Sequence, residues 1–166
     1  MTEGNFLQHD IPIGALTSII SRSRSIILNN QLKPLNISAG QFPIMMYLSK
    51  HQNVTQETLA RHFHIDRGTI ARSVKKLEDA GYIIRTIDPE NRRAIRLFLS
   101  EQGRKITPDL IRIDANWEET VSTTLTGSDK VQFREILMKV ATASIQGVRD
   151  NGNETYGSCC TRGDCV

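Results

Sequence analysis

The sequence lacks the apolar segments of a membrane or secreted protein. It has no run of about 18 apolar residues, and residues 1–10 contain no basic stretch followed by an apolar core. We therefore expect a cytoplasmic protein without a membrane partner. The three Asn-x-Ser/Thr triplets, at Asn36, Asn53 and Asn153, are then chance occurrences rather than glycosylation sites.

Cysteine is scarce and confined to the end of the sequence, where Cys159, Cys160 and Cys165 occur. A disulfide framework in the core is therefore excluded. Residues 150–166 are rich in Gly, Asn and Ser without periodicity, which predicts a flexible tail. Clustered thiolates bind soft metals and oxidise readily when exposed, so a thiol- or metal-responsive role stays open.

Motifs of catalysis and of cofactor binding are also missing. There is no Gly-rich phosphate loop, no nucleophile elbow and no paired-His motif. His62 and His64 are two residues apart, and His9 and His51 are distant, so no spacing resembles a transition-metal site. We expect neither an enzyme nor a protein with a bound metal or cofactor.

The positive charge is concentrated in one segment. The net charge of +3 says little by itself about a nucleic-acid partner. Between Arg67 and Arg96, however, eight basic residues stand against four acidic ones, so this segment carries more net charge than the whole chain. A local concentration of this kind favours a nucleic-acid contact at this segment.

Apolar periodicity and caps predict the helices. A first amphipathic helix runs to about Leu32, where Lys33-Pro34 ends it. Three short helices follow, each announced by an apolar residue, a capping residue and a second apolar residue five positions after the first. Pro43 lies inside the first of the three and predicts a kinked first turn. The starts are Ile37-Ser38 with Phe42, Val54-Thr55 with Leu59, and Ile65-Asp66 with Ile70.

After Gly81 the pattern changes to that of strands. Residues 82–87 and 94–99 predict a β-hairpin whose turn is Asp88-Pro89-Glu90-Asn91. Helices over residues 104–125 and 129–149 complete the chain. The fold class expected is mainly α with a small β-hairpin wing: a winged helix-turn-helix core flanked by N- and C-terminal helices.

The helix after Asp66 is the candidate DNA-reading element. On a helical wheel Ile70, Val74 and Leu77 share one arc, which must face the core. The opposite arc is cationic, and such a helix fits the major groove, where Arg and Lys donate to guanine and Thr can touch the thymine methyl. The candidate recognition-helix residues are Arg67, Gly68, Thr69, Arg72, Ser73, Lys75 and Lys76.

Other segments supply further candidate contacts. The hairpin tip, Arg92-Arg93, predicts arginines that enter the minor groove. Ser38, Thr55 and Gln56, near helix N-termini, are candidate phosphate contacts. A winged helix used for protein binding remains an alternative, although such surfaces are usually less basic and more apolar at their centre.

Residues 38–103 resemble the multiple antibiotic resistance regulator (MarR) family of winged-helix proteins. Two departures occur: Asn91 stands where the family often has Asp, which would weaken an ion pair bracing Arg93, and Ser100 stands where Thr is usual, which keeps the cap. The matching pieces are residues 38–42, residues 55–60, residues 76–83, and the wing from Asp88-Pro89-Glu90-Asn91-Arg92-Arg93 to Leu99-Ser100-Glu101-Gln102-Gly103.

The resemblance implies a homodimer that binds a pseudo-palindromic operator on double-stranded DNA. Residues 36–103 would be the DNA-binding domain, residues 11–33 and 104–149 the dimerisation helices, and residues 1–10 an N-terminal extension. The apolar surface of the flanking helices agrees with this, because a small winged-helix core cannot cover it. Two-fold symmetry predicts half-sites about one helical turn apart.

The resemblance also implies that the protein represses transcription and that a small anionic or phenolic ligand relieves its binding to DNA. That ligand would bind between the dimerisation helices and the DNA-binding domain. The candidate pocket residues are Arg22, Phe42 and Met46.

Overall fold

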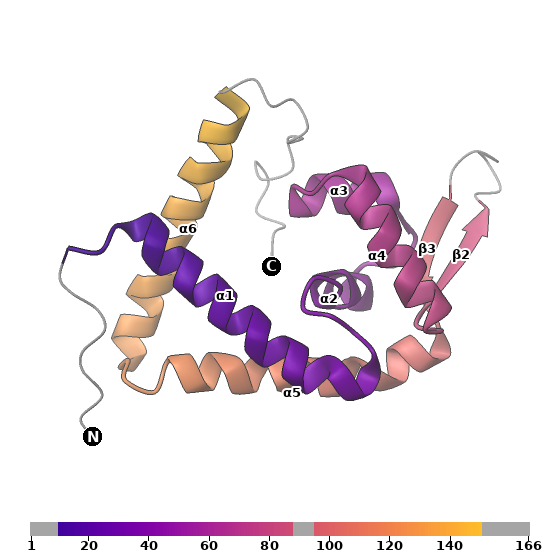
Figure 1. Cartoon of the computed structure of the whole chain (residues 1–166), viewed down its shortest axis with the longest axis horizontal. Coiled ribbons are helices and arrows are strands. Elements are labelled where there is room, and N and C mark those ends of the chain that lie inside the picture. Colours follow the sequence, from indigo (N-terminus) through magenta and orange to yellow (C-terminus); the bar gives the residue numbers. More distant parts are fainter. Residues whose placement is uncertain (1–9, 88–94, 151–166) are drawn as a thin grey trace.

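The computed structural model describes residues 10–87 and 95–150, and these residues are mainly helical with a small antiparallel sheet (Figure 1). The fold class predicted from the sequence is confirmed. The hairpin tip and the segment that contains the three cysteines lie outside the described residues. No helix in the described ranges is long and apolar enough to cross a membrane.

The elements follow the predicted order, with one strand added. They are α1 (Ile13–Leu32), the short 3-10 helix η1 (Lys33–Leu35), α2 (Phe42–Lys50), β1 (Val54–Thr55), α3 (Gln56–Phe63), α4 (Arg67–Asp79), β2 (Ile83–Ile87), β3 (Ile95–Leu99), α5 (Glu101–Val121) and α6 (Gly127–Asp150).

Two of the three predicted helix caps are confirmed. Thr55 accepts a hydrogen bond at Oγ1 from the backbone amide of Thr58 (3.1 Å), and Asp66 Oδ1 accepts one from the amide of Thr69 (2.8 Å). Each cap satisfies an amide of the first turn that has no partner within its helix.

The predicted start after Ser38 is wrong, because α2 begins at Phe42. Gln41 Oε1 accepts hydrogen bonds from both the amide and the hydroxyl of Ser38, at 2.8 and 2.9 Å, and these contacts hold residues 38–41 in a turn. Pro43 therefore falls in the first turn of α2, where its missing N–H breaks no helical hydrogen bond.

The sheet has the strand order β1-β3-β2 and is antiparallel throughout. In register, Val54 faces Leu97 across β1 and β3, and Ile83 faces Leu99 across β2 and β3. Gly81 has a φ of +80°, which supports its predicted role at the end of α4. The sheet thus packs the hairpin directly behind α4.

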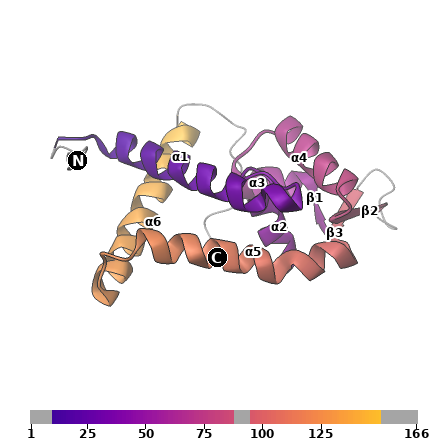
Figure 2. The same ribbon diagram turned by 60° about the horizontal axis from the view of Figure 1, so that its bottom comes forward.

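One buried cluster joins the winged-helix core to the flanking helices. It contains Leu28 and Leu32 of α1, Leu110 of α5, and buried residues of α2, α3, α4 and the sheet. The C-terminal half of α1 therefore lies beside α5 (Figures 1 and 2). Helix α6 differs, because none of its described side chains is buried and it projects from the far end of α5.

Tyr82 is the junction between α5 and the hairpin. Its carbonyl accepts a hydrogen bond from the amide of Ser100 (2.9 Å), and its hydroxyl donates to the carbonyl of Leu35 (2.8 Å). Gly103, in the first turn of α5, is buried against it: a Cβ there would lie 2.3 Å from the Tyr82 carbonyl oxygen. Only glycine allows this approach.

We predict that Gly103→Ala lowers the free energy of unfolding by about 1–3 kcal/mol, because the added methyl group must push α5 away from Tyr82. Urea unfolding followed by circular dichroism measures the change. Gly14→Ala in α1 is the matched control, since a Cβ there meets nothing within 4 Å. Equal losses for the two variants would contradict the close packing.

Candidate nucleic-acid interface

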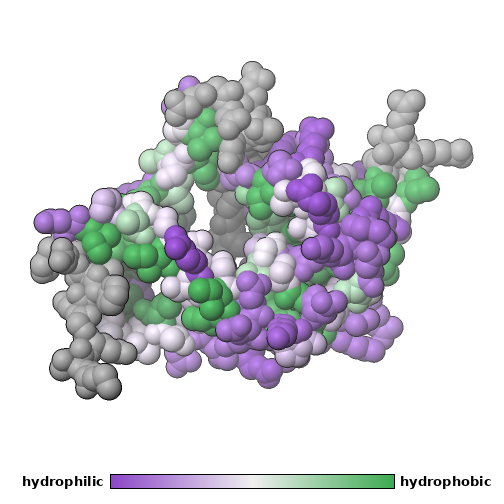
Figure 3. Space-filling model, in the orientation of Figure 1, coloured by the Kyte–Doolittle hydropathy of each residue, from purple (hydrophilic) through white to green (hydrophobic). Residues whose placement is uncertain are grey.

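Helix α4 separates an apolar face from a cationic one. Ile70, Val74 and Leu77 are 1%, 0% and 0% exposed, whereas Arg72, Lys75 and Lys76 are exposed. Arg67 and Gly68 are also exposed, and Thr69 and Ser73 are half-buried. Figure 3 shows hydrophilic side chains gathered on the side of the molecule that carries α4. The predicted division of this helix is therefore present in the structure.

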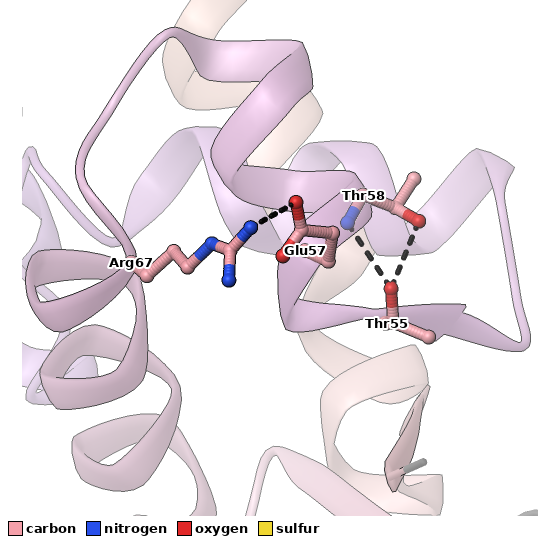
Figure 4. A network of polar contacts seen from close by, with 4 residues as sticks. All are labelled: Thr55, Glu57, Thr58 and Arg67. Carbon is pink, nitrogen blue, oxygen red and sulfur yellow. Dashed lines mark hydrogen bonds and ion pairs between the residues drawn. The ribbon is translucent and has the colours of Figure 1, made fainter. Parts of the chain in front are cut away.

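The first turns of α3 and α4 lie next to each other (Figure 4). Arg67 Nη2 of α4 contacts Glu57 Oε1 of α3 at 2.7 Å, and both side chains are exposed. Thr55, which caps α3, also lies 3.0 Å from the hydroxyl of Thr58. The ion pair thus links the first turns of two helices, and the N-terminus of a helix favours a phosphate group nearby.

Two of the cationic side chains of α4 already form ion pairs with acidic residues of the chain. Lys75 Nζ contacts Asp79 Oδ1 at 2.6 Å and Glu78 Oε2 at 3.9 Å, and the hydrogen bond to Asp79 raises the pKa of Lys75 above its ordinary value. Arg67 is similarly bound to Glu57. Among the described residues neither Arg72 nor Lys76 forms a direct ion pair, although the charge of Arg72 helps to lower the pKa of the nearby Asp66. Their charges are therefore less neutralised than those of Arg67 and Lys75.

Arg72 is held in position by its own helix. Its Nη2 donates to the Thr69 hydroxyl at 2.8 Å. A Cβ at Gly68 would lie 3.1 Å from Asp66 Oδ1 and 3.4 Å from Arg72 Nη1, so the absence of a side chain leaves room for both groups. The start of α4 thus presents a positioned guanidinium beside bare backbone.

A polar groove runs beside the C-terminal half of α4, with a cavity volume of about 540 Å³. Lys76 and Ser38, both candidate contacts from the sequence, line it together with Lys33 of η1. The structure therefore brings Ser38 next to the recognition helix. Lys33 was not a candidate, because in the sequence it is only the residue that precedes the helix-stopping Pro34. The other lining residues are Asn29, Asn36, Ile37, Gln41, Asp79 and Ala80.

The base of the wing is fixed beside α4. Arg85 Nε of β2 contacts Glu78 Oε2 of α4 at 3.0 Å, and Arg96 of β3 donates to the carbonyl of Asn53 at 3.4 Å. Arg92 and Arg93 lie outside the described residues, as do Cys159, Cys160 and Cys165. Gln56, at the start of α3, is half-buried.

A second cavity, of about 350 Å³, lies where α1, α2, α3 and α5 meet. We call it the Arg24 cavity. Arg24 contacts Asp114 of α5 at 2.6 Å, and its guanidinium carbon lies 5.7 Å from the centre of the Phe42 ring and 5.0 Å from that of Trp117. The cavity is lined by Arg24, Phe42, Pro43, Met46, Tyr47, Lys50, His51, His62, Phe63 and Asp114.

The structure brings two of the three predicted pocket residues together. Phe42 and Met46 line the Arg24 cavity, whereas Arg22 is exposed on α1 and is not among the lining residues. The arginine that lines this cavity is therefore Arg24, not the predicted Arg22. No group of three or more His, Cys, Asp or Glu residues in the described part of the chain could hold a metal ion.

Comparisons with known proteins agree with this geometry. The sequence model of the MarR family matches residues 37–95. An uncharacterized HTH-type transcriptional regulator of Bacillus subtilis, YybA, is 31% identical over 122 residues, which cover 74% of this chain and 81% of the relative. The multiple antibiotic resistance protein MarR of Escherichia coli is 27% identical over 132 residues, covering 78% and 90%. The name of YybA is that of a transcriptional regulator.

Solved structures show the same fold. A crystal structure of MarR has a TM-score of 0.77 at 31% identity and covers 87% of this chain and 98% of its own. A MarR family transcriptional regulator from Listeria monocytogenes, crystallised with a 26mer DNA, has a TM-score of 0.76 at 28% identity, covering 85% and 91%.

The cap of α4 gives a pH-dependent prediction. The hydroxyl and the amide of Thr69 hold the pKa of Asp66 below its usual value of 3.8. The stabilisation is therefore complete above that value and is lost as the pH falls through the lower pKa of the folded protein. Asp66→Ala should lower Tm at neutral pH, and the Tm difference from the unchanged protein should shrink below about pH 4.

Thr55→Ala is the matched control, because it removes an uncharged cap with the same geometry at α3. Its Tm difference should stay constant over the same pH range, as measured by thermal unfolding. A pH-independent effect of Asp66→Ala would show that its charge plays no part in capping α4.

Proposed function

The chain belongs to the MarR family of transcriptional regulators, and we propose that it acts as a homodimeric repressor that binds a pseudo-palindromic operator on double-stranded DNA. We further propose that a small anionic or phenolic effector relieves this binding. The single observation that supports DNA binding most strongly is the exposed cationic face of α4 opposite its buried stripe.

In this proposal α4 lies in the major groove. Arg72 reads base edges, because a guanidinium positioned by Thr69 loses little further freedom on donating two hydrogen bonds to guanine. Gly68 lets the backbone approach closely. The crystal of the Listeria monocytogenes relative with DNA supports this function for a chain of the same fold. The proposed recognition-helix contacts are Arg67, Gly68, Thr69, Arg72, Ser73, Lys75 and Lys76.

Phosphate contacts flank the recognition helix. Ser38 lies in the groove with Lys76, and Thr55 and Gln56 stand at the adjacent N-terminus of α3. In this proposal the two sets contact the two phosphate backbones that border one major groove. Arg92 and Arg93 of the wing would add minor-groove contacts.

The flanking helices supply the proposed dimer interface. Ile13, Ile19, Ile20 and Ile26 of α1 are exposed, and Figure 3 shows hydrophobic side chains on the outer surfaces of α1 and α6. Helix α6 has 24 residues and no buried described side chain, and an isolated helix gains too little to hold its shape in water. A second copy that covers α6 accounts for both facts. The exposed apolar residues of α6 are Val131, Phe133, Ile136, Leu137 and Met138.

The Arg24 cavity is the proposed effector site. Its walls combine aromatic rings with Arg24, Lys50 and two imidazoles, a composition that suits an aromatic ligand with one negative charge. It lies between α1 and α5, which we assign to the dimer, and α2 and α3, which belong to the winged-helix core. A ligand in this cavity can change the orientation of the winged-helix core relative to α1 and α5.

Selection of bound duplexes from a random pool, with the purified full-length chain, tests the proposal. Recovered sites should share two inverted half-sites about one helical turn apart. The affinity for a selected duplex should fall steeply as salt rises, because each phosphate contact releases counterions. A winged helix that binds proteins instead would show no selected site and little dependence on salt.

We predict that Arg72→Ala weakens binding to the selected site by about 1–3 kcal/mol and relaxes the preference at one base pair of each half-site. Competition binding with single-base operator variants measures both effects. Arg112→Ala on α5 is the matched control, since Arg112 is exposed and its ion pair is with Asp109 of its own helix. An unchanged base preference would remove Arg72 from the readout.

We predict that Ile136→Glu converts the dimer to monomer, because it places a charge in the proposed apolar interface on α6. Sedimentation equilibrium gives the molecular mass, and circular dichroism shows whether the winged-helix core stays folded. Gln132→Glu, an exposed polar position of the same helix, should leave the dimer intact. A dimeric Ile136→Glu protein would place the interface elsewhere.

A further inference from the structure

Two imidazoles that line the Arg24 cavity lie against the ring of the same tyrosine. The ring of His51, at the C-terminus of α2, lies 4.5 Å from the ring of Tyr47, and that of His62, near the end of α3, lies 4.3 Å from it. His51 is exposed and His62 is half-buried. Imidazole is the side-chain group whose charge changes most readily near physiological pH, so this cavity contains groups that can accept a proton when an anion binds.

The carboxylate among the charged groups around these imidazoles is already paired with an arginine. Helix α1 contributes Arg24, α2 contributes Lys50 and α5 contributes Asp114. Asp114 is the one carboxylate among the lining residues, and Arg24 binds it at 2.6 Å. Arg61 of α3 is exposed and does not line the cavity, and His64 follows α3. A proton on His51 or His62 therefore adds to a cationic surrounding.

Without a ligand, protonation of His62 is unfavourable. Burial lowers the pKa of His62 below its ordinary value of 6.5, and the neighbouring imidazoles of His51 and His64 lower it further. A neutral His62 is thus favoured at neutral pH. A negative charge placed in the cavity would reverse the balance, because an opposite charge within about 4–6 Å of an imidazole favours its protonated form.

We propose that an aromatic carboxylate binds in the Arg24 cavity together with protons that are taken up by His51 and His62. This inference rests on the effector site proposed above and adds its regulation: the protein binds the anion more tightly as the pH falls. Phe42, Tyr47 and Phe63 offer rings for the aromatic part, and the imidazolium groups and Lys50 face the carboxylate.

The direction follows from linkage. If the bound anion raises the pKa of an imidazole, protonation of that imidazole must raise the affinity for the anion by the same factor. Each unit of pKa change is worth about tenfold in affinity. We expect benzoate and 1-naphthoate to bind at least about tenfold more tightly at about pH 5.5 than at about pH 8, since both carboxylates remain ionised over this range.

Calorimetry on the full-length chain tests the coupling. Benzoate or 1-naphthoate is titrated at three pH values, each in two buffers with different ionisation enthalpies, so that the protons taken up per subunit can be counted. Trp117, the single tryptophan of the sequence, lies against Arg24 and reports occupancy by its fluorescence. Benzamide, which has the same ring and no charge, should show neither proton uptake nor pH dependence.

Variants identify the groups. Replacing both imidazoles, as His51→Gln with His62→Gln, should remove the pH dependence and the proton uptake. His64→Asn is the matched control and should retain both, because His64 does not line the cavity and Asn tolerates its positive φ. Should the double variant fold poorly, proton NMR of the unchanged protein gives the imidazole pKa values directly, and benzoate should raise two of them.

Three outcomes would overturn the inference: proton uptake that persists in the double variant, carboxylate affinity that does not change with pH, or no carboxylate binding at about pH 5.5 in the millimolar range. Operator binding measured on the same preparations separates this failure from that of the proposed function. A protein that still selects a palindromic duplex remains a DNA-binding regulator, whatever the Arg24 cavity binds.

Discussion

The burial of Ile70, Val74 and Leu77 decides which side of α4 meets the solvent, and the proposed function depends on this orientation. Burying one such side chain contributes about 1.5–3 kcal/mol, whereas ion pairs between exposed side chains contribute much less. The apolar stripe therefore orients the helix, and the cationic face follows from it. Charges on that face can serve recognition because the fold depends little on them.

The same core extends beyond the winged helix into the flanking helices. Leu28 and Leu32 of α1 and Leu110 of α5 share it with α4 and the sheet. Arg24 adds a polar link, because one guanidinium contacts Asp114 and Trp117 on α5 and Phe42 on α2. Helices α1 and α5, which we assign to the dimer interface, therefore share one core with α4, which we assign to DNA binding. The Arg24 cavity lies where α1 and α5 meet the winged-helix core.

Local signals predicted most of the elements, and long-range contacts account for what was missed. The caps at Thr55 and Asp66 and the inward stripe of α4 depend on residues within one or two turns, so the sequence alone could locate them. The start of α2 was placed too early, because the side chain of Gln41 bonds back to Ser38 and holds a turn. Strand β1 has two residues and exists only through pairing with β3.

The pocket residues show the same limit. Arg22 and Arg24 are two positions apart, about 200° around a helix, and in the sequence both are flanked by serines. Only Asp114, 90 positions away, shows which arginine faces inward. The imidazoles of His51 and His62 likewise meet at Tyr47 only after α2 and α3 have packed.

The contact between Gly103 and Tyr82 has a consequence for motion. It joins the first turn of α5 to the hairpin, and the hydroxyl of Tyr82 joins the hairpin to Leu35 of η1, which follows α1. The first turn of α5 therefore moves together with the winged-helix core as one rigid unit. A change in the distance between the two α4 helices of the proposed dimer must then come from bending of α5 beyond Gly103. Pro108 already interrupts the helical hydrogen bonds of α5 there.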